Sequence, residues 1–577
     1  MPVANVTWIA WISLLILMIS CASPTPAPSS PAPSSASSTT GAPKRFTAAI
    51  SGDPNTLSNS VARAGAGGVP GLDALEMFVS SGLTVEDDRG ARQPQLAESV
   101  PTLENGGWRL LPDGRMETRW TIRPNTLWHD GTPVTAHDLV FTLLVGQDQD
   151  IPALGNAGYA SIESVEATES QADARTVLVR WQRPFIFADG IFSFGFGLPL
   201  PRHLLERAYR EDKVNFTQAP YWTTEFVGSG PYRVRQWVQG SHMVLAANDR
   251  YVLGKPIIDE IEVRFIPDSN TLFATILAGE VGLTMGRGLS LEQASQLRDQ
   301  WRDGTLGIVL SSWIALYPQM LNPSPPLVAD ARFRRALLHA VDRQQMVEAL
   351  QASQSLVAHS YLSPREPEYA DIERSVVRYE YDARRTSELM EGLGYTRGAD
   401  GGLRDASGQP LTLEIRTTGG DDLQEKTMLS VTDYWQRAGV NVEPVVVAQQ
   451  RARDREYRAN FPGFEEVRQP NDLSTGALTR FIGSEAALAE NGYRGNNRMR
   501  YRSAELDTLV DRFYSTVPRT ERIQVLGDVM HHLTDQVIPG GIFYNAAPTM
   551  ISNRLVNVGP GGSRVPPSWN VREWDVR

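Results

Sequence analysis

The chain contains a single cysteine, Cys21, in 577 residues. One cysteine cannot form an internal disulfide, and it excludes zinc or iron–sulfur sites that need several cysteines. Lysine is also scarce, because only Lys44, Lys213, Lys255 and Lys426 occur among 55 basic residues. The formal net charge is −11, which argues against nucleic acid as the main partner because phosphate binding requires a basic surface.

The motifs of the common hydrolases and nucleotide-binding enzymes are absent from the sequence. It has no HExxH, no GxSxG and no P-loop, and no SxxK, which excludes the Ser/Lys arrangement of penicillin-binding lipoproteins. His129-Asp130 and His137-Asp138 offer donors that suit zinc or iron, but HDGTP is also the composition of a tight turn. We favour the turn, and we expect no catalytic residue, no metal site and no cofactor.

Only one stretch of the sequence is long and apolar, WIAWISLLILMIS at 8–20. As a helix it would span about 20 Å, short of the roughly 30 Å hydrocarbon core, so it has the length of a signal-peptide core. Cys21 follows at once, and the pattern resembles a bacterial lipobox, which implies removal of a signal peptide at 1–20 and diacylation of Cys21. An uncleaved signal anchor is the alternative, since the segment before it carries no Lys or Arg. Either way, we expect the body of the protein outside the cytoplasm.

The next segment, 22–43, uses only Ala, Ser, Pro, Thr and Gly. Such a composition cannot bury enough apolar surface to offset its ordering entropy. We therefore predict that 21–43 is an extended, lipid-anchored tether between the membrane and the folded body.

The body mixes short β-like runs with amphipathic helices, which predicts an α/β architecture with mixed sheets. Thr135 and Asp138 have the spacing of a capping box that opens a helix. A strand, a helix and a strand between 410 and 447 predict a right-handed parallel βαβ unit. One long amphipathic helix is expected at 330–350, and a Gly/Pro-rich tail is expected after a helix near 519–536. Further strands are expected at 47–52, 115–124, 176–182 and 259–268.

Four ordered blocks of the body resemble the family 5 extracytoplasmic solute-binding proteins of ABC importers, the dipeptide, oligopeptide and nickel-binding group. They are LWHDGTPVTAHDLVFTL at 127–143, the GPY and NDRYVLGKP motifs within 227–265, FRRALLHAVDRQQMV within 330–350, and 381–395 followed by Asp400-Gly401. The resemblance covers most of the chain from about 44 to 571. These blocks are mainly turns, caps and packing contacts, so they identify the scaffold and say little about the ligand.

The resemblance implies a bilobal, periplasmic-binding-protein-like α/β fold of class II with an extra N-terminal subdomain and a hinge of crossing strands. It implies a core of lobe I at 44–80, 216–308 and 536–577. The extra subdomain of lobe I is expected at 81–215, and lobe II at 309–535.

The resemblance also points to candidate ligand-binding residues. In peptide-binding relatives an Asp-Tyr pair in the second lobe holds the peptide amine, and here the comparable stretch, FPGFEEVRQPNDL at 461–473, lacks that pair. Three carboxylates in it could hold an amine or a cation, or could be solvated, and Arg468 could neutralise one of them. Phe192, Phe194 and Phe196 alternate, so we expect them on one strand face. The candidates are Glu465, Glu466, Asp472, Phe194, Phe196, Tyr159 and Trp435, with core packing as the alternative for at least two of the three phenylalanines.

The function implied is that of an extracytoplasmic receptor. It would capture a peptide-like solute between two closing lobes and deliver it to a membrane permease whose ATPase is separate. We expect it to be a monomer without nucleic-acid partners. A surface sensor or chaperone on the same scaffold is an alternative. A metal chelate, a sugar oligomer or a cationic metabolite are alternative solutes. A hydrolase is not expected, because no catalytic constellation stands out.

Overall fold

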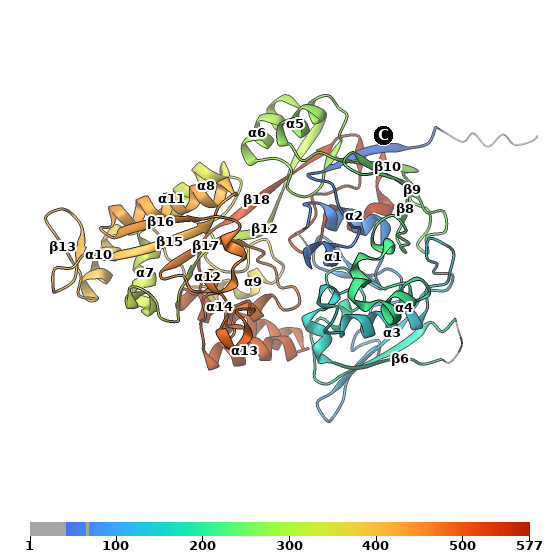
Figure 1. Cartoon of the computed structure of the whole chain (residues 1–577), viewed down its shortest axis with the longest axis horizontal. Coiled ribbons are helices and arrows are strands. Elements are labelled where there is room, and N and C mark those ends of the chain that lie inside the picture. Colours follow the sequence, from blue (N-terminus) through green and yellow to red (C-terminus); the bar gives the residue numbers. More distant parts are fainter. Residues whose placement is uncertain (1–41, 65–67, 170, 172) are drawn as a thin grey trace, which may run out of the picture. The chain divides into compact units, whose positions relative to one another are not determined.

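The computed structural model describes residues 42–64, 68–169, 171 and 173–577 (Figure 1). The apolar segment 8–20, Cys21 and most of the predicted tether lie outside these residues, so the predictions made for them stay predictions. In the described part of the chain, no helix is both long enough and apolar enough to cross a bilayer.

A ten-stranded mixed sheet draws its strands from the start, the middle and the end of the body. β1 pairs in parallel with β10 and β11, whereas β18 is antiparallel to both β11 and β12. In spatial order the strands are β16 (Asn441–Val447), β15 (Thr412–Thr418), β17 (Phe464–Gln469), β12 (Gly304–Pro318), β18 (Gly540–Ser552), β11 (Leu283–Thr284), β1 (Arg45–Ile50), β10 (Glu260–Phe265), β9 (His242–Ala247) and β8 (Tyr232–Val238).

The longest strands of this sheet are β12, with 15 residues, and β18, with 13 residues. Their antiparallel register runs from Gly304 opposite Ser552 to Leu316 opposite Gly540. The prediction of a Gly/Pro-rich tail after 536 is therefore wrong for 540–552. All residues of β18 except Ala547 are buried, so the strand lacks the polar–apolar alternation by which a half-exposed strand is recognised.

The predicted parallel βαβ unit is confirmed, with β15 and β16 joined by α11 (Asp422–Arg437). Asp421 caps the helix by accepting a hydrogen bond from the Gln424 N–H. Figure 1 shows α11 lying along these two strands, and both strands contact it. Met428, Val431 and Trp435 of α11 face a core shared with the strands.

The segment expected to be one long helix at 330–350 is two helices, α7 (Ala331–His339) and α8 (Arg343–Gln351). Asp342 separates them, because its side chain accepts a hydrogen bond from the Gln345 N–H at 2.9 Å and so caps α8. An N-cap residue has non-helical backbone angles, which interrupts the helix. The apolar residues of 330–350 keep a helical spacing on both sides of Asp342, so the sequence pattern did not indicate the break.

A second, four-stranded antiparallel sheet has the order β4 (Trp108–Leu110), β5 (Met116–Thr121), β7 (Thr176–Trp181) and β6 (Ile162–Ala167). Helix α3 (Ala136–Gly146) contacts β6 and β7, and the predicted capping box of Thr135 and Asp138 is confirmed at its start. This sheet falls within 81–215, the range predicted for the extra subdomain, whose boundaries stay a prediction.

The remaining elements lie outside these two sheets. The helices are α1 (Asn59–Ala64), α2 (Leu72–Val79), α4 (Arg202–Glu211), α5 (Ser269–Leu277), α6 (Leu291–Gln300), α9 (Tyr369–Ile372), α10 (Ala383–Gly392), α12 (Arg455–Ala459), α13 (Ala504–Ser515) and α14 (Arg519–Asp535). The short strand pairs are β2 (Thr84–Glu86) with β3 (Arg92–Pro94), β13 (Thr396–Arg397) with β14 (Leu403–Arg404), and β19 (Leu555–Val556) with β20 (Asp575–Val576).

Candidate functional site

A cavity of about 660 Å³ lies among segments that are far apart in the sequence. Its size is in the range of cavities that hold small molecules and short peptides. Parts of 58–76, 194–200, 468–474 and 560–567 line it, together with Val309 and Ser312 of β12 and Ala547 and Thr549 of β18. A ligand in this cavity would touch both long strands and four separate loops or helices.

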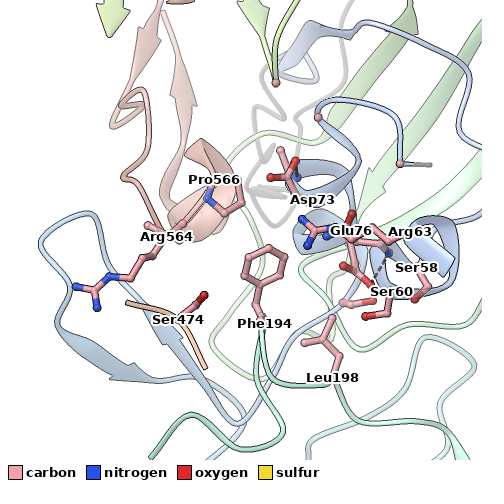
Figure 2. A pocket seen from close by; sticks show the side chains of 18 of the residues that line it. Ser58, Ser60, Arg63, Asp73, Glu76, Phe194, Leu198, Ser474, Arg564 and Pro566 are labelled. Carbon is pink, nitrogen blue, oxygen red and sulfur yellow. Dashed lines mark hydrogen bonds between the residues drawn. The ribbon is translucent and has the colours of Figure 1, made fainter. Parts of the chain in front are cut away.

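Two acidic side chains, Asp73 and Glu76, enter the cavity from α2 (Figure 2). Residues three apart share one face of a helix, so the two carboxyls are neighbours. Glu76 is 8% exposed, and its Oε1 accepts a hydrogen bond from the Asn59 N–H at 3.2 Å. Within the described residues, neither carboxyl forms an ion pair.

Burial and, to a smaller extent, the nearby Asp73 carboxylate raise the pKa of Glu76 to about 8, against the opposing effects of the Asn59 N–H and Arg63. The pKa of Asp73 is also raised, mainly by burial. A cation placed between the two carboxyls would favour their ionised forms. This corner of the cavity is therefore suited to an amine or another cationic group.

The position of α2 is fixed by its packing. Seven of its eight residues are buried, and Gly71 at its start has a positive φ of 93°. A Cβ at Gly71 would lie 2.6 Å from the backbone oxygen of Met285, so the chain can approach this closely only without a side chain. We did not predict Asp73 or Glu76 as site residues. The sequence did contain a signal for them. A helix that is apolar on all sides is buried, so two acids within it are buried acids, which are candidates for a site.

The expectation of a strand at Phe192, Phe194 and Phe196 is wrong, because the segment forms turns. Phe192 has a positive φ of 57° and is fully buried. Figure 2 shows the Phe194 ring projecting into the cavity, with Arg564 and Pro566 on one side and Glu76 on the other. The alternation in sequence therefore did not place the three rings on a common face.

Phe196 and Tyr159 also line the cavity and are nearly buried. Their ring centroids lie 5.4 Å apart in an edge-to-face arrangement. Burial raises the pKa of the Tyr159 hydroxyl above its usual range, so the phenol stays neutral. The two rings form an apolar wall in the cavity.

The three predicted carboxylates of the 461–473 segment do not lie together. Asp472 lines the cavity, and its Oδ1 accepts a hydrogen bond from the Ser474 N–H at 2.7 Å. Glu465 and Glu466 are successive residues of β17 and therefore point to opposite faces of the sheet. Both are buried outside the cavity lining.

Glu465 pairs with Arg498, and its Oε1 lies 3.9 Å from Nε of Arg416. Glu466 has no hydrogen bond to its carboxyl from the described residues, and burial raises its pKa well above the usual range. Arg468, which we expected to neutralise one of the three acids, lines the cavity and pairs with Asp421 instead.

Trp435, the remaining candidate, lies in the core between α11 and the sheet. Its indole N–H donates a hydrogen bond to the Leu337 carbonyl at 3.0 Å, and its ring contacts that of Phe464. The structure thus brings Phe194, Phe196, Tyr159 and Asp472 to one cavity. It places Glu465, Glu466 and Trp435 elsewhere, and the ligand-binding roles of all seven stay predictions.

Arg564 forms the wall opposite Glu76 and was not predicted from the sequence. Its Nε lies 3.0 Å from Oε1 of Glu86 and 3.7 Å from Oε2 of Glu366, and its Nη2 lies 3.6 Å from Oε1 of Glu368. Burial raises the pKa of Glu366 to about 7, against the opposing charge of Arg564. The segment GPGGSRVPP gave no periodic signal, although a lone arginine among Gly and Pro was visible in it.

Comparison with known protein families decides the family to which this chain belongs. Residues 92–474 match the family described as bacterial extracellular solute-binding proteins, family 5 middle, and the match covers more than half of the chain. The chain belongs to this family. Family 5 proteins bind solutes, and the family is not one of enzymes, which agrees with the absence of catalytic motifs in this sequence.

Among curated family 5 proteins, the chain is 25% identical over 377 residues to the oligopeptide-binding protein AppA of Bacillus subtilis. That alignment covers 65% of this chain and 64% of AppA, which is less than two thirds of the relative. A putative ABC transporter peptide-binding protein of Brucella melitensis is 22% identical over 465 residues, with 77% of this chain and 81% of the relative covered.

Solved structures show the same fold. The structure of AppA from Bacillus subtilis in complex with a nonapeptide matches with a TM-score of 0.69 and 21% identity, covering 93% of this chain and 100% of that one. NikA from Brucella suis in complex with Fe(III)-EDTA matches with a TM-score of 0.74 and 18% identity, covering 92% and 100%. The predicted periplasmic-binding-protein-like α/β fold is confirmed.

Proposed function

We propose that this family 5 protein is the substrate-binding receptor of an ABC importer and that it captures a peptide-like solute in the 660 Å³ cavity. The observation that carries the proposal is the cavity itself, which has an apolar wall at Phe194, Phe196 and Tyr159 and an acidic corner at Asp73 and Glu76, where neither carboxyl forms an ion pair with a described residue. A peptide offers an amine and apolar side chains in the same molecule. Relatives described as oligopeptide-binding proteins support this class of solute.

We propose that this acidic corner takes the place of the Asp-Tyr pair that the resemblance implies for peptide-binding relatives. We propose that the peptide amine lies near Asp73 and Glu76, where its positive charge shifts both carboxyls to their ionised forms. Asp472 and Arg564 would then contact polar groups farther along the solute. Phe194 would pack against its apolar side chains.

The remaining features of the proposal concern the setting of the receptor. We propose that Cys21 is lipidated and holds the protein outside the cytoplasm through the 21–43 tether. Lobe I would consist of 44–80, 216–308 and 536–577 together with the extra subdomain 81–215, and lobe II would be 309–535. The two lobes would close on the solute, and the receptor would act as a monomer. A separate membrane permease with its own ATPase would receive the solute, since this chain has no P-loop.

Native mass spectrometry of the full-length chain, before and after mild denaturation, tests the proposal. The expected result is a set of peptide masses that leave the protein when it unfolds. A single non-peptide mass, such as a metal chelate, would keep the receptor but exclude the peptide. An empty cavity that no peptide pool stabilises against heat would contradict the proposal and favour a sensor without transport.

A further inference from the structure

A second cavity, of about 530 Å³, is lined by five arginines: Arg455, Arg458, Arg480, Arg494 and Arg498. We call it the arginine pocket. Its other lining residues are Ala459, Gln469, Gly476, Ala487, Tyr493, Gly495 and Asn496, so no carboxylate stands among the described residues that line it. This is unusual in a chain whose net charge is −11.

The arginines of the pocket are poorly neutralised. Other exposed arginines of the described residues vary, since Arg202 pairs with Glu206 and Arg332 with Asp330, whereas Arg89 and Arg302 pair with no acid. In the pocket, no ion pair joins Arg455, Arg458, Arg480 or Arg494 to an acid within the described part of the chain, and here the four lie together. Arg498 alone has a counterion.

That counterion, Glu465, lies beneath the pocket and is shared. It pairs with Arg498, and it is also within 3.9 Å of Arg416, which is buried behind the pocket. Nε of Arg498 and Nε of Arg416 are buried and have no hydrogen-bond partner in the described residues. One carboxylate therefore lies between two buried guanidinium groups, and the Nε–H donors of both groups have no acceptor among the described residues.

Two carboxylates lie at the edge of the pocket without lining it. Oε2 of Glu485 accepts a hydrogen bond from the Asn496 N–H at 3.4 Å. Glu456 accepts a hydrogen bond from the Tyr493 hydroxyl at 3.2 Å, at the edge of the pocket. Arg480 is held by uncharged acceptors, with its Nη1 donating to Oε1 of Gln469 at 2.9 Å. The pKa of Arg458 is lowered by desolvation and by the positive charges of Arg498 and Arg416, although Glu465 opposes this. The like charges thus repel one another in the absence of an anion.

We propose that the arginine pocket binds an anion, a carboxylate or phosphate group held by several guanidinium groups at once. Planar guanidinium groups donate paired hydrogen bonds to both kinds of oxyanion, and multiply charged anions benefit most from such a cluster. The pocket goes beyond the proposed function, because anion binding here requires no peptide in the larger cavity.

The anion has two possible sources. Gln469 lines both the arginine pocket and the larger cavity, so the two are neighbours, and one source is the acidic tail of a long solute whose route into the pocket would pass Gln469. A free anion, such as inorganic phosphate or a small polycarboxylate, would bind without that route. The chemistry of recognition is the same for both sources.

Calorimetric titration of the full-length chain with citrate and with inorganic phosphate at low ionic strength tests the proposal. The expected result is saturable binding of one anion per chain, weakened by added salt. The variant R455Q/R458Q/R494Q should bind at least about tenfold more weakly, because it removes three charge-assisted donors. These three side chains are exposed, so the variant is expected to fold.

The matched control R207Q/R384Q/R437Q removes the same charge from three exposed helical arginines that pair with acids one turn away. Its affinity for citrate should stay within about twofold of the parent, because it lies outside the pocket. No saturable binding of either anion, or an equal loss in the control, would overturn the proposal. These titrations use no peptide, so their outcome is independent of the proposed function.

A competition arm then identifies the source. Peptides that end in several glutamates, and their amidated glutamine counterparts, are added to the citrate-bound chain. Release of citrate by the acidic peptide alone assigns the pocket to the tail of the solute. Simultaneous binding of citrate and acidic peptide assigns it to a free anion.

Discussion

The Nε of Arg564 lies 3.0 Å from Oε1 of Glu86, and this pair joins the C-terminal segment of the body to the β2–β3 hairpin. The two side chains are 13% and 16% exposed, and Glu366 and Glu368 approach the same guanidinium. One arginine thus neutralises carboxylates from two distant parts of the sequence. Its removal would leave Glu366 and Glu368 without an ion pair among the described residues, while Glu86 would keep its contact with Arg92.

We expect R564Q to lower the free energy of unfolding by about 3 kcal/mol, because it leaves buried carboxylates unpaired. Urea unfolding of the variant and the parent at neutral pH measures the change. The control is R572Q, because Arg572 pairs with the exposed Glu573 in the same segment, and its loss should cost less than about 1 kcal/mol. Equal effects of the two substitutions would contradict the role given to Arg564.

The raised pKa of Glu76 predicts a specific dependence of stability on pH. In the folded chain this carboxyl keeps its proton up to about pH 8, whereas its ordinary pKa is 4.5. The contribution of Glu76 to the free energy of unfolding is therefore fully present below pH 4.5. It is lost as the pH rises toward 8, and the loss reaches up to about 5 kcal/mol. E76Q cannot ionise, so it should gain stability relative to the parent as the pH rises.

Chemical unfolding of E76Q and the parent at pH 5, 7 and 9 measures this difference. E225Q serves as the control, because Glu225 is exposed and its replacement removes one carboxyl from the surface without disturbing a buried site. A difference between E76Q and the parent that is constant from pH 5 to pH 9 would rule out the raised pKa.

Phe194 and Trp435 allow packing in the cavity to be separated from packing in the core. F194A should weaken the binding of peptides by about tenfold or more with only a small loss of stability, because the ring projects into the cavity. W435F should cost about 2–3 kcal/mol of stability, because it removes a buried hydrogen bond and volume. Peptide titration and urea unfolding of each variant measure the two effects. A loss of affinity confined to W435F would reverse the assignment.

The lipid anchor is testable at a single residue. C21A should move the protein from the membrane fraction to the soluble fraction, because it removes the proposed site of diacylation. Fractionation followed by mass spectrometry of the N-terminus checks both location and modification. Membrane retention of the parent without any lipid mass on its N-terminus would favour the uncleaved signal anchor.

Local sequence signals predicted those parts of the fold that local interactions determine. The capping box at Thr135 and Asp138 and the βαβ unit around α11 both follow from patterns within a few residues. The break at Asp342 was not predicted, because its cap lies within a continuous apolar pattern. Strand β18 was not predicted, because both of its faces are buried and its sequence does not alternate. The family was predictable because its blocks are turns and caps of this local kind.

The candidate site was less predictable, because segments distant in sequence form it. Asp472 and Phe194 were chosen by analogy and lie in the cavity, but the adjacent Glu465 and Glu466 are carried to opposite faces of β17. Asp73, Glu76 and Arg564 come from stretches with no recognisable motif. Their proximity depends on the order of the strands in the sheet, which the sequence pattern alone does not specify.

Strand β18 has a consequence for the synthesis and export of this chain. In the ten-stranded sheet it alone joins the strands β16, β15, β17 and β12 to the strands β11, β1, β10, β9 and β8. Until residues 540–552 have left the ribosome, β12 and β11 each lack their β18 neighbour, and the sheet remains in two halves. The sheet would thus be completed only once residue 552 has emerged, and until then the earlier strands remain accessible to a translocation channel that accepts unfolded polypeptide.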